Sequence, residues 1–215
     1  KVADIAISAK FRNNGQVCIS PNRFYVQENV KNEFVNAFID RAKKLKIGNG
    51  MDEGVNLGPL TTAKRLEEIE KLVDKTKKEG AEVLLGGKRP SGFNKGFFYE
   101  PTVFDHVKDD FTIMKEEPFG PLVPMLSFKS FDEVIERAND NDLGLCSYLY
   151  TNSMDKANRG SELLETGCVA VNTGAVAIAE APFGGIKQTG YGREGGSMAI
   201  KDYLNVKYTH MALEI

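Results

Sequence analysis

The sequence is poor in cysteine and histidine, the side chains from which disulfide frameworks and most zinc sites are built. Its 215 residues include three cysteines and two histidines. Cys18, Cys146 and Cys168 are odd in number and form no Cys-x-x-Cys pair, so they indicate neither a disulfide framework nor a zinc site. His106 and His210 stand in unrelated contexts. A metal role is therefore not expected.

The sequence also lacks an excess of either charge and any apolar run long enough to span a membrane. It has 28 basic and 30 acidic side chains, a formal net charge of −2, with the two signs interspersed. This balance argues against nucleic acid or a membrane surface as a partner. The N-terminus has no charged, apolar, small-residue order of a signal peptide. We therefore expect a cytoplasmic or organelle-matrix protein.

Apolar residues recur at helical spacing in several segments and form short runs in others. The spacing predicts helices at 28–46, 61–79, 130–139 and 153–165. The short apolar runs predict strands at 23–27, 82–85, 122–128, 145–150 and 168–171. Strands that alternate with helices are typical of parallel crossover units. The sequence therefore predicts an α/β domain with a mostly parallel sheet and helices on both faces.

The ends of the chain indicate how this domain is bounded. The first residue is Lys1 rather than Met, and helix-compatible sequence follows at once, which we interpret as a segment of a longer protein. Residues 1–198 are predicted to form the main domain, and residues 199–215 a C-terminal tail. Within the tail, residues 203–208 alternate polar and apolar side chains. This pattern predicts a strand that pairs with a neighbour or lies at an edge.

Cys18 is the residue most suggestive of chemistry. It follows a Gly in a polar turn between a helical segment and a predicted strand. A nucleophilic thiol needs partial exposure and nearby donors or a cation, which such a turn can supply. The alternative is a small buried side chain, which is what most free cysteines are. Cys146 and Cys168, at the start of apolar runs, are interpreted as packed thiols.

Three segments resemble signatures of the aldehyde dehydrogenase family. Residues 11–18, Phe-Arg-Asn-Asn-Gly-Gln-Val-Cys, are similar to the catalytic-cysteine motif F-x-N-x-G-Q-x-C. Residues 116–121, Glu-Glu-Pro-Phe-Gly-Pro, resemble E-E-x-F-G-P. Residues 182–187, Pro-Phe-Gly-Gly-Ile-Lys, and the Thr-Gly-Tyr-Gly-Arg-Glu that follows resemble the C-terminal loop. The three occur in the family's order, and the resemblance is strongest to the succinate-semialdehyde group.

The resemblance implies an enzyme that oxidises an aldehyde to the acid with NAD or NADP and no metal. Cys18 would attack the aldehyde carbon, and its backbone N–H would hold the resulting oxyanion together with an asparagine. Glu117 would accept hydrogen bonds from the nicotinamide ribose hydroxyls, and Phe119 would pack near the nicotinamide. Phe183 would line the substrate site. The asparagine, the base glutamate and the cofactor-binding domain are expected before Lys1, so the isolated chain should be inactive.

Arg12 carries the prediction of substrate class. The succinate-semialdehyde group has Arg at this position, and its guanidinium can bind a distal carboxylate bidentately. The alternative is that Arg12 only pairs with a nearby acid. A serine that this group commonly offers to the carboxylate is missing from residues 172–178. The substrate could therefore instead be glutarate or 2-oxoglutarate semialdehyde. Ser20 stands where several relatives have a second cysteine, so their disulfide switch should be absent.

Two functions of other classes compete with this prediction. A non-catalytic relative could keep the fold as a structural or assembly module, and a cysteine hydrolase could use Cys18 with a histidine base. The motif residues that argue against the first are Asn13, Gly15, Gln16, Cys18, Glu117 and Phe119. The second lacks a histidine in a partner motif. By resemblance, the whole protein is expected to be a homo-oligomer, a dimer or a tetramer.

Overall fold

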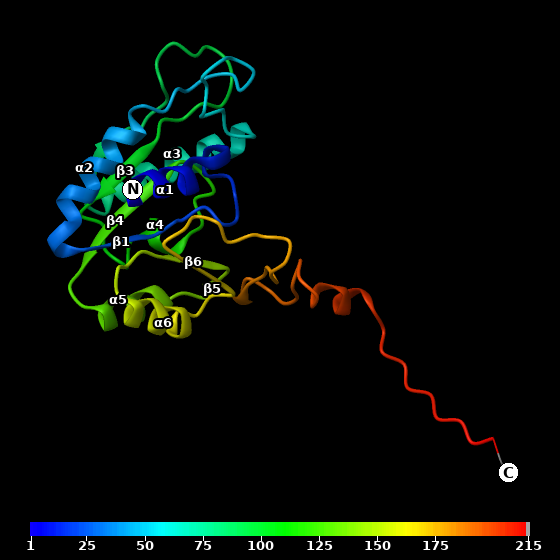
Figure 1. Ribbon diagram of the computed structural model, residues 1–215. Helices are drawn as coiled ribbons and strands as arrows, with labels where there is room; N and C mark the ends of the chain where they lie inside the picture. Colours follow the sequence, from blue (N-terminus) through cyan, green and yellow to red (C-terminus); the bar gives the residue numbers. More distant parts are fainter. Residues whose placement is uncertain (214–215) are drawn as a thin grey trace.

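The computed structural model describes residues 1–213, and a four-stranded sheet lies at its centre. The strand order is β1 (Phe24–Gln27), β4 (Leu122–Phe128), β3 (Thr102–Asp105) and β2 (Glu82–Leu85). β4 pairs in parallel with both β1 and β3, whereas β2 is an antiparallel edge strand. The predicted α/β fold with a mostly parallel sheet is confirmed (Figure 1).

Helices cover both faces of this sheet. Side chains of a strand point alternately to its two faces, and the two faces of β4 belong to different apolar clusters. Leu122 packs in the cluster that contains the apolar face of α3 (Ala63–Lys78). Its neighbour Val123 packs in the cluster that contains α1 (Val2–Phe11) and α2 (Lys31–Ala42). The chain segment that carries Cys18 thus leaves the α1 side of the sheet.

A smaller layer follows β4. In chain order its elements are α5 (Phe131–Asn139), β5 (Leu143–Gly144), β6 (Cys146–Leu149), α6 (Met154–Leu163), β7 (Cys168–Val171) and β8 (Ile186–Lys187). β6 pairs in parallel with β7, and β5 pairs antiparallel with β8. The strands predicted at 122–128, 145–150 and 168–171 therefore do not share one sheet, because β6 and β7 form a sheet separate from β4. Both edges of β4 are already occupied, by β1 and by β3, so β6 cannot pair beside it.

Several boundaries also differ from the sequence prediction. The helix expected at 28–46 begins as a 3-10 turn, η2 (Glu28–Val30), and its α-helical part ends at Ala42. β3 was not predicted, because its four residues begin with Thr and end with Asp and form no apolar run. The structure also adds a short helix, α4 (Thr112–Lys115), just before the Glu-Glu-Pro-Phe-Gly-Pro segment.

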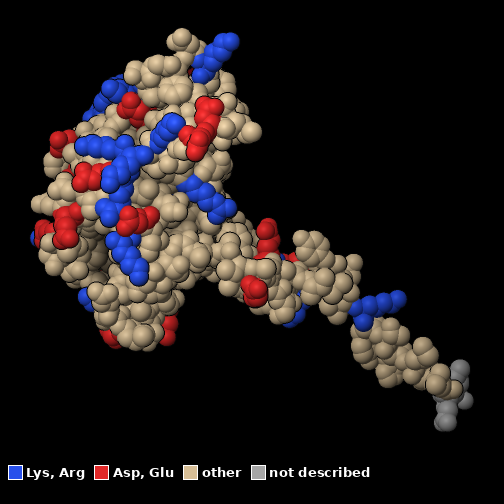
Figure 2. Space-filling view, turned by 45° about the horizontal axis from the view of Figure 1, so that its top comes forward, with Lys and Arg blue, Asp and Glu red and all other residues tan. Residues whose placement is uncertain are grey.

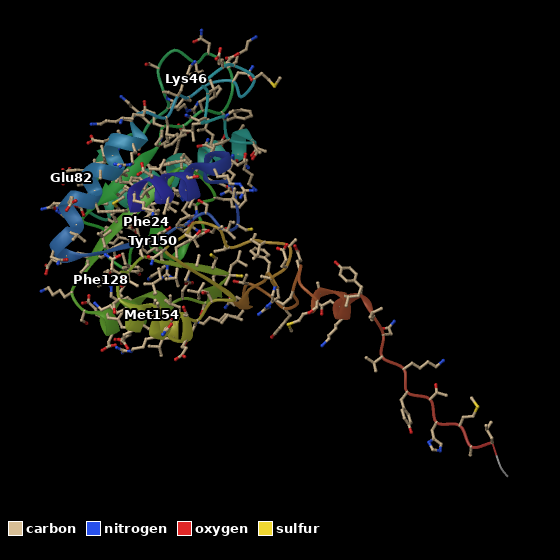
Figure 3. All side chains as sticks on the ribbon, viewed as in Figure 1. Phe24, Lys46, Glu82, Phe128, Tyr150 and Met154 are labelled. Carbon is tan, nitrogen blue, oxygen red and sulfur yellow. The ribbon has the colours of Figure 1, made fainter. Side chains whose placement is uncertain are left out.

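The C-terminal tail leaves the body of the molecule. After η3 (Ala199–Tyr203) the chain is extended and runs away from the rest (Figure 1). Leu204 and Val206 are 62% and 101% exposed, and the tail's side chains project into open space (Figure 3). The strand predicted at 203–208 has no pairing partner within residues 1–213. Polar and apolar side chains alternate along this segment. Because no other described strand pairs with it, its apolar side chains are left uncovered.

Charged side chains of both signs lie near one another on the face of the body shown in Figure 2. This matches the near-equal numbers of basic and acidic residues in the sequence. Among the described helices, none combines the length and the apolar character needed to cross a membrane.

Candidate active site

Cys18 follows a turn of unusual backbone conformation. α1 ends at Phe11, and the turn η1 (Arg12–Gly15) comes next. Asn13, Asn14 and Gly15 have φ values of 48°, 58° and 74°, all in the left-handed region. Asn and Gly are the residues that enter this region at least cost. The Asn-Asn-Gly sequence therefore permits a sharp change of direction, after which the Cys18 side chain is exposed.

Hydrogen bonds to the segment 58–61 hold this turn in place. The Gln16 Oε1 atom accepts from the backbone N–H of Thr61 at 3.0 Å and from its hydroxyl at 2.8 Å. The Asn14 Nδ2 atom donates to the carbonyl of Gly58 at 3.0 Å. Gln16 and Asn14 are both buried, so these bonds are shielded from competition with water. The motif residues around Cys18 thus act as anchors for its loop.

Two further hydrogen bonds fix the chain on the other side of Cys18. The Tyr148 hydroxyl, from β6, donates to the carbonyl of Ile19 at 2.9 Å, and the Ser20 hydroxyl donates to the carbonyl of Lys10 at 3.0 Å. The backbone N–H of Cys18 itself has no hydrogen-bond partner within residues 1–213. Cys18 is therefore an exposed thiol on an anchored loop, with a free backbone donor beside it.

A hollow of about 540 Å³ opens beside this loop. Its lining includes Val17 and Ile19, the two neighbours of Cys18, together with the small and apolar residues 174–177. Three polar residues also line it at intervals of four positions: Asp4 and Ser8 from α1, and Arg12, which follows the end of that helix.

Arg12 is exposed in this hollow and takes part in none of the described ion pairs, which use other arginines such as Arg41, Arg137 and Arg159. The alternative that Arg12 serves an internal salt bridge thus finds no support within residues 1–213. Asp4, by contrast, is engaged. Its hydrogen bond with the Arg41 guanidinium lowers the pKa of its carboxyl group to about 2. Within residues 1–213, Arg12 is therefore a cation that lines the hollow and has no ion-pair partner.

The Glu117–Phe119 segment packs directly against the Cys18 loop. A Cβ atom on Gly15 would lie 2.2 Å from the carbonyl oxygen of Gly120, so the two backbones touch. Phe119 has a φ of 45°, and its ring lies 6.0 Å from the guanidinium carbon of Arg65. Glu117 is exposed and forms no ion pair within the described residues. The structure thus brings the first two motifs together, although about 100 residues separate them.

Sequence reasoning missed Lys10. Its side chain is 0% exposed, and its Nζ atom has no hydrogen-bond partner within residues 1–213. Burial lowers the pKa of its ammonium group to about 7, while the charge of Glu117 acts in the opposite direction. The signal in the sequence was its position: Ala3, Ala6 and Lys10 lie on one buried helical stripe of α1. A lysine on an apolar stripe is uncommon and should have been singled out.

Cys146 and Cys168, far apart in sequence, are register partners on β6 and β7. Both are partly buried, and burial raises the pKa of the Cys146 thiol to about 12. They therefore behave as packed thiols rather than as nucleophiles. Phe183 is half-buried, and its backbone forms a bridge with Glu194. It is not part of the lining of the Arg12 hollow, so its role in substrate binding stays a prediction.

Comparison with known proteins extends these observations to the whole chain. The model of the aldehyde dehydrogenase family matches residues 1–209. The mitochondrial succinate-semialdehyde dehydrogenase of Oryza sativa subsp. japonica is 43% identical over 96% of this chain and 39% of its own length. A glutarate-semialdehyde dehydrogenase of Pseudomonas putida is 44% identical over 97% of this chain and 42% of its own length.

The fold agrees with this match. The crystal structure of a succinate-semialdehyde dehydrogenase from Burkholderia pseudomallei is 42% identical, with a TM-score of 0.90 over 94% of this chain and 41% of that one. The chain thus spans about two fifths of the length of these relatives. Family model, sequence identity and fold all agree with the motifs around Cys18 and Glu117. The chain therefore belongs to the aldehyde dehydrogenase family.

Proposed function

We propose that this chain supplies the nucleophile and the substrate-carboxylate contact of an NAD(P)-dependent semialdehyde dehydrogenase. The whole enzyme joins this chain to the additional segment that its relatives carry. Its substrate is succinate semialdehyde or a similar ω-carboxylated aldehyde, which it converts to the acid. The remaining catalytic groups, including the general base, belong to that additional segment. The chain alone is therefore inactive.

The observation that carries the proposal is the position of Arg12. It lines the same hollow as the two neighbours of Cys18 and has no ion-pair partner within residues 1–213. A guanidinium binds a carboxylate with two parallel hydrogen bonds, an arrangement that fixes the orientation of the bound group. A substrate with its carboxylate at Arg12 would extend its aldehyde carbon toward Cys18.

The chemistry proposed for Cys18 is that of the aldehyde dehydrogenase family, and the surroundings of Cys18 are compatible with it. The sulfur attacks the aldehyde carbon and forms a C–S bond, and the carbonyl oxygen becomes negatively charged. The unpartnered backbone N–H of Cys18 can donate to that oxygen, which is the usual role of a backbone amide beside an acyl-transfer nucleophile. After oxidation the acyl group is held as a thioester on Cys18, and water releases the acid.

The residues at the Glu117 loop fit a nicotinamide cofactor. When bound, such a cofactor accepts the hydride from the aldehyde carbon. Glu117 has an exposed carboxylate without a described ion pair, which suits acceptance of two vicinal hydroxyl groups. Phe119, two residues further along the loop, has a left-handed backbone, and its ring has a cation–π contact with Arg65. NAD and NADP are both compatible with these residues.

The terminal segment is proposed to bind a second copy of the chain. Leu204, Val206 and Tyr208 lie at alternate positions and are 62%, 101% and 83% exposed. An extended segment with one apolar side is suited to pair with the edge of a neighbouring sheet. We therefore keep residues 199–215 as an oligomerisation tail, of which residues 214 and 215 lie outside the described part. Its test is size-exclusion chromatography of the whole enzyme with and without residues 204–215.

The substrate assignment is tested by replacing Arg12 with Met in the whole enzyme. Turnover is compared for succinate semialdehyde and for butanal, an aldehyde of the same chain length without the carboxylate. A lost charge-assisted hydrogen bond should lower kcat/KM for the semialdehyde about 10- to 100-fold, while kcat/KM for butanal should change little. Arg89→Met is the matched control, since Arg89 pairs with Glu70 and does not line the hollow.

An equal loss with both aldehydes would contradict the proposed role of Arg12 but not the dehydrogenase chemistry. Absence of turnover with any aldehyde and either cofactor would contradict the activity itself. Glutarate semialdehyde should be assayed in parallel, because a relative from Pseudomonas putida is named for it. A higher kcat/KM with this longer substrate would identify the second candidate as the correct one.

A further inference from the structure

Lys10 is a buried cation that the chemistry described so far does not use. Its side chain is 0% exposed, and its Nζ atom has no hydrogen-bond partner within residues 1–213. A buried ammonium group without a partner costs free energy, and long lysine side chains normally avoid this by reaching the surface. Groups kept in such a costly environment tend to lie at functional sites.

The charge of Glu117 acts on Lys10. Burial lowers the pKa of the ammonium group to about 7, and the negative charge of Glu117 raises it. The two groups form no ion pair, so the interaction acts across a gap. Because the interior around Lys10 is shielded from water, the attraction is stronger than it would be between two exposed charges at the same distance.

The two charged groups also belong to segments that are locked together. Lys10 lies two residues before Arg12, where the turn η1 begins, and this turn brings Gly15 against the backbone of Gly120. Glu117 itself is exposed and has no described hydrogen-bond or ion-pair partner that would set the orientation of its carboxylate. The buried charge of Lys10 can supply that orientation.

We propose that Lys10 is a positioning residue for Glu117: its buried ammonium group draws the carboxylate toward the Cys18 loop, in the orientation that accepts the cofactor's ribose hydroxyls. The inference rests on the proposed function, because it assumes that Glu117 contacts the cofactor. Lys10 itself touches neither substrate nor cofactor. The buried charge of Lys10 lowers the stability of the fold and raises the affinity for the cofactor. Active-site residues commonly have such opposite effects on stability and function.

The test is Lys10→Met in the whole enzyme, with dissociation constants for NAD and NADP measured by titration and the unfolding midpoint measured without ligand. Met has a similar volume and no charge, so the cost of burying the ammonium group is removed. We expect a higher Tm together with a dissociation constant weakened about three- to thirtyfold. A residue with a purely structural role would not move these two quantities in opposite directions.

Lys115→Met is the matched control, because Lys115 lies just before the same loop but is exposed. It should leave both the Tm and the dissociation constant nearly unchanged. Glu117→Gln provides the second control, since Lys10→Met should have no further effect on cofactor affinity once the carboxylate is gone. This double-mutant cycle measures the coupling directly.

The pH dependence offers a readout that needs no substitution at Lys10. With a pKa of about 7 in the folded protein, Lys10 loses its charge as the pH rises through neutrality. Cofactor affinity of the unmodified enzyme should therefore weaken between about pH 6 and about pH 8, and this step should vanish in Glu117→Gln. Glu117 is the charged group that acts on Lys10. The profile tests the proposal even if Lys10→Met does not fold.

The outcomes separate the inference from the function on which it rests. If the unmodified enzyme binds neither NAD nor NADP, the proposed function fails. If it binds a dinucleotide but Lys10→Met binds it equally well, the positioning role is overturned. A lower Tm for Lys10→Met would also overturn it, because Lys10 would then have a stabilising partner inside the protein.

Discussion

Gly15→Ala should separate the Cys18 loop from the Glu117 loop, because two independent costs meet at this residue. The φ of Gly15 is 74°, and an L-residue in that region costs about 1–2 kcal/mol. The new Cβ atom would also lie 2.2 Å from the carbonyl oxygen of Gly120, which is backbone and cannot rotate away. Overpacking of this kind costs about 1–3 kcal/mol. The expected destabilisation is therefore about 2–5 kcal/mol.

Two other glycines allow these costs to be separated. Gly80 has a φ of 109° with nothing within 4 Å of an added Cβ atom, so Gly80→Ala reports the backbone cost alone. Gly50 has neither feature, and Gly50→Ala should be neutral or slightly stabilising. The apparent midpoint of unfolding in urea should thus be highest for Gly50→Ala, lower for Gly80→Ala and lowest for Gly15→Ala.

The functional assay is the rate at which iodoacetamide alkylates Cys18, followed by peptide mass spectrometry. In Gly15→Ala, displacement of the loop should change this rate and lower cofactor affinity, whereas both control variants should resemble the unmodified protein. If Gly15→Ala is no less stable than Gly80→Ala, the backbone contact with Gly120 carries no energetic weight, and the account of how the two motifs are held together is refuted.

Three further outcomes are expected. Gln16→Ala removes an acceptor that serves two donors of Thr61, so it should lower the free energy of unfolding by about 1–3 kcal/mol in urea titrations; an unchanged midpoint would contradict the anchoring role. Because the pKa of Cys146 is raised to about 12, iodoacetamide at about pH 8 should label Cys18 well before Cys146, as peptide mapping can show. The Tm difference between Lys10→Met and the unmodified enzyme should be largest below about pH 7 and shrink as the pH rises from about 7 toward about 10. Below the folded pKa of about 7 the ammonium group bears its full burial cost, and this cost is relieved as the pH approaches the unfolded value of 10.5.

Much of the architecture followed from local patterns. β2, β4 and β7 lie where the apolar runs predicted them, and α3 and α6 lie within two residues of the predicted bounds. In these segments the apolar residues either recur at helical spacing or form a short continuous run. The side chains that this pattern predicts to be buried agree with the local preference for helix or strand. β3 was missed because its burial comes from neighbouring strands and not from its own composition.

The division of the described strands into one four-stranded and two two-stranded sheets could not be predicted in the same way. Whether β6 pairs beside β4 depends on whether an edge of β4 is free, and both edges are taken by strands distant in sequence. A strand's neighbours are set by long-range pairing, which the local alternation of strand and helix does not specify.

The candidate site shows the same contrast. The sequence by itself determined the chemistry that is available: a cysteine in a polar turn, an arginine six residues before it, and the Glu-Glu-Pro-Phe-Gly-Pro segment. Tertiary structure alone decided how these parts meet. It placed Arg12 in a hollow beside Cys18, brought Gly15 against Gly120, and buried Lys10 within reach of the charge of Glu117. Residue types limit which reactions are possible, but distances and burial arise only when segments far apart in sequence pack together.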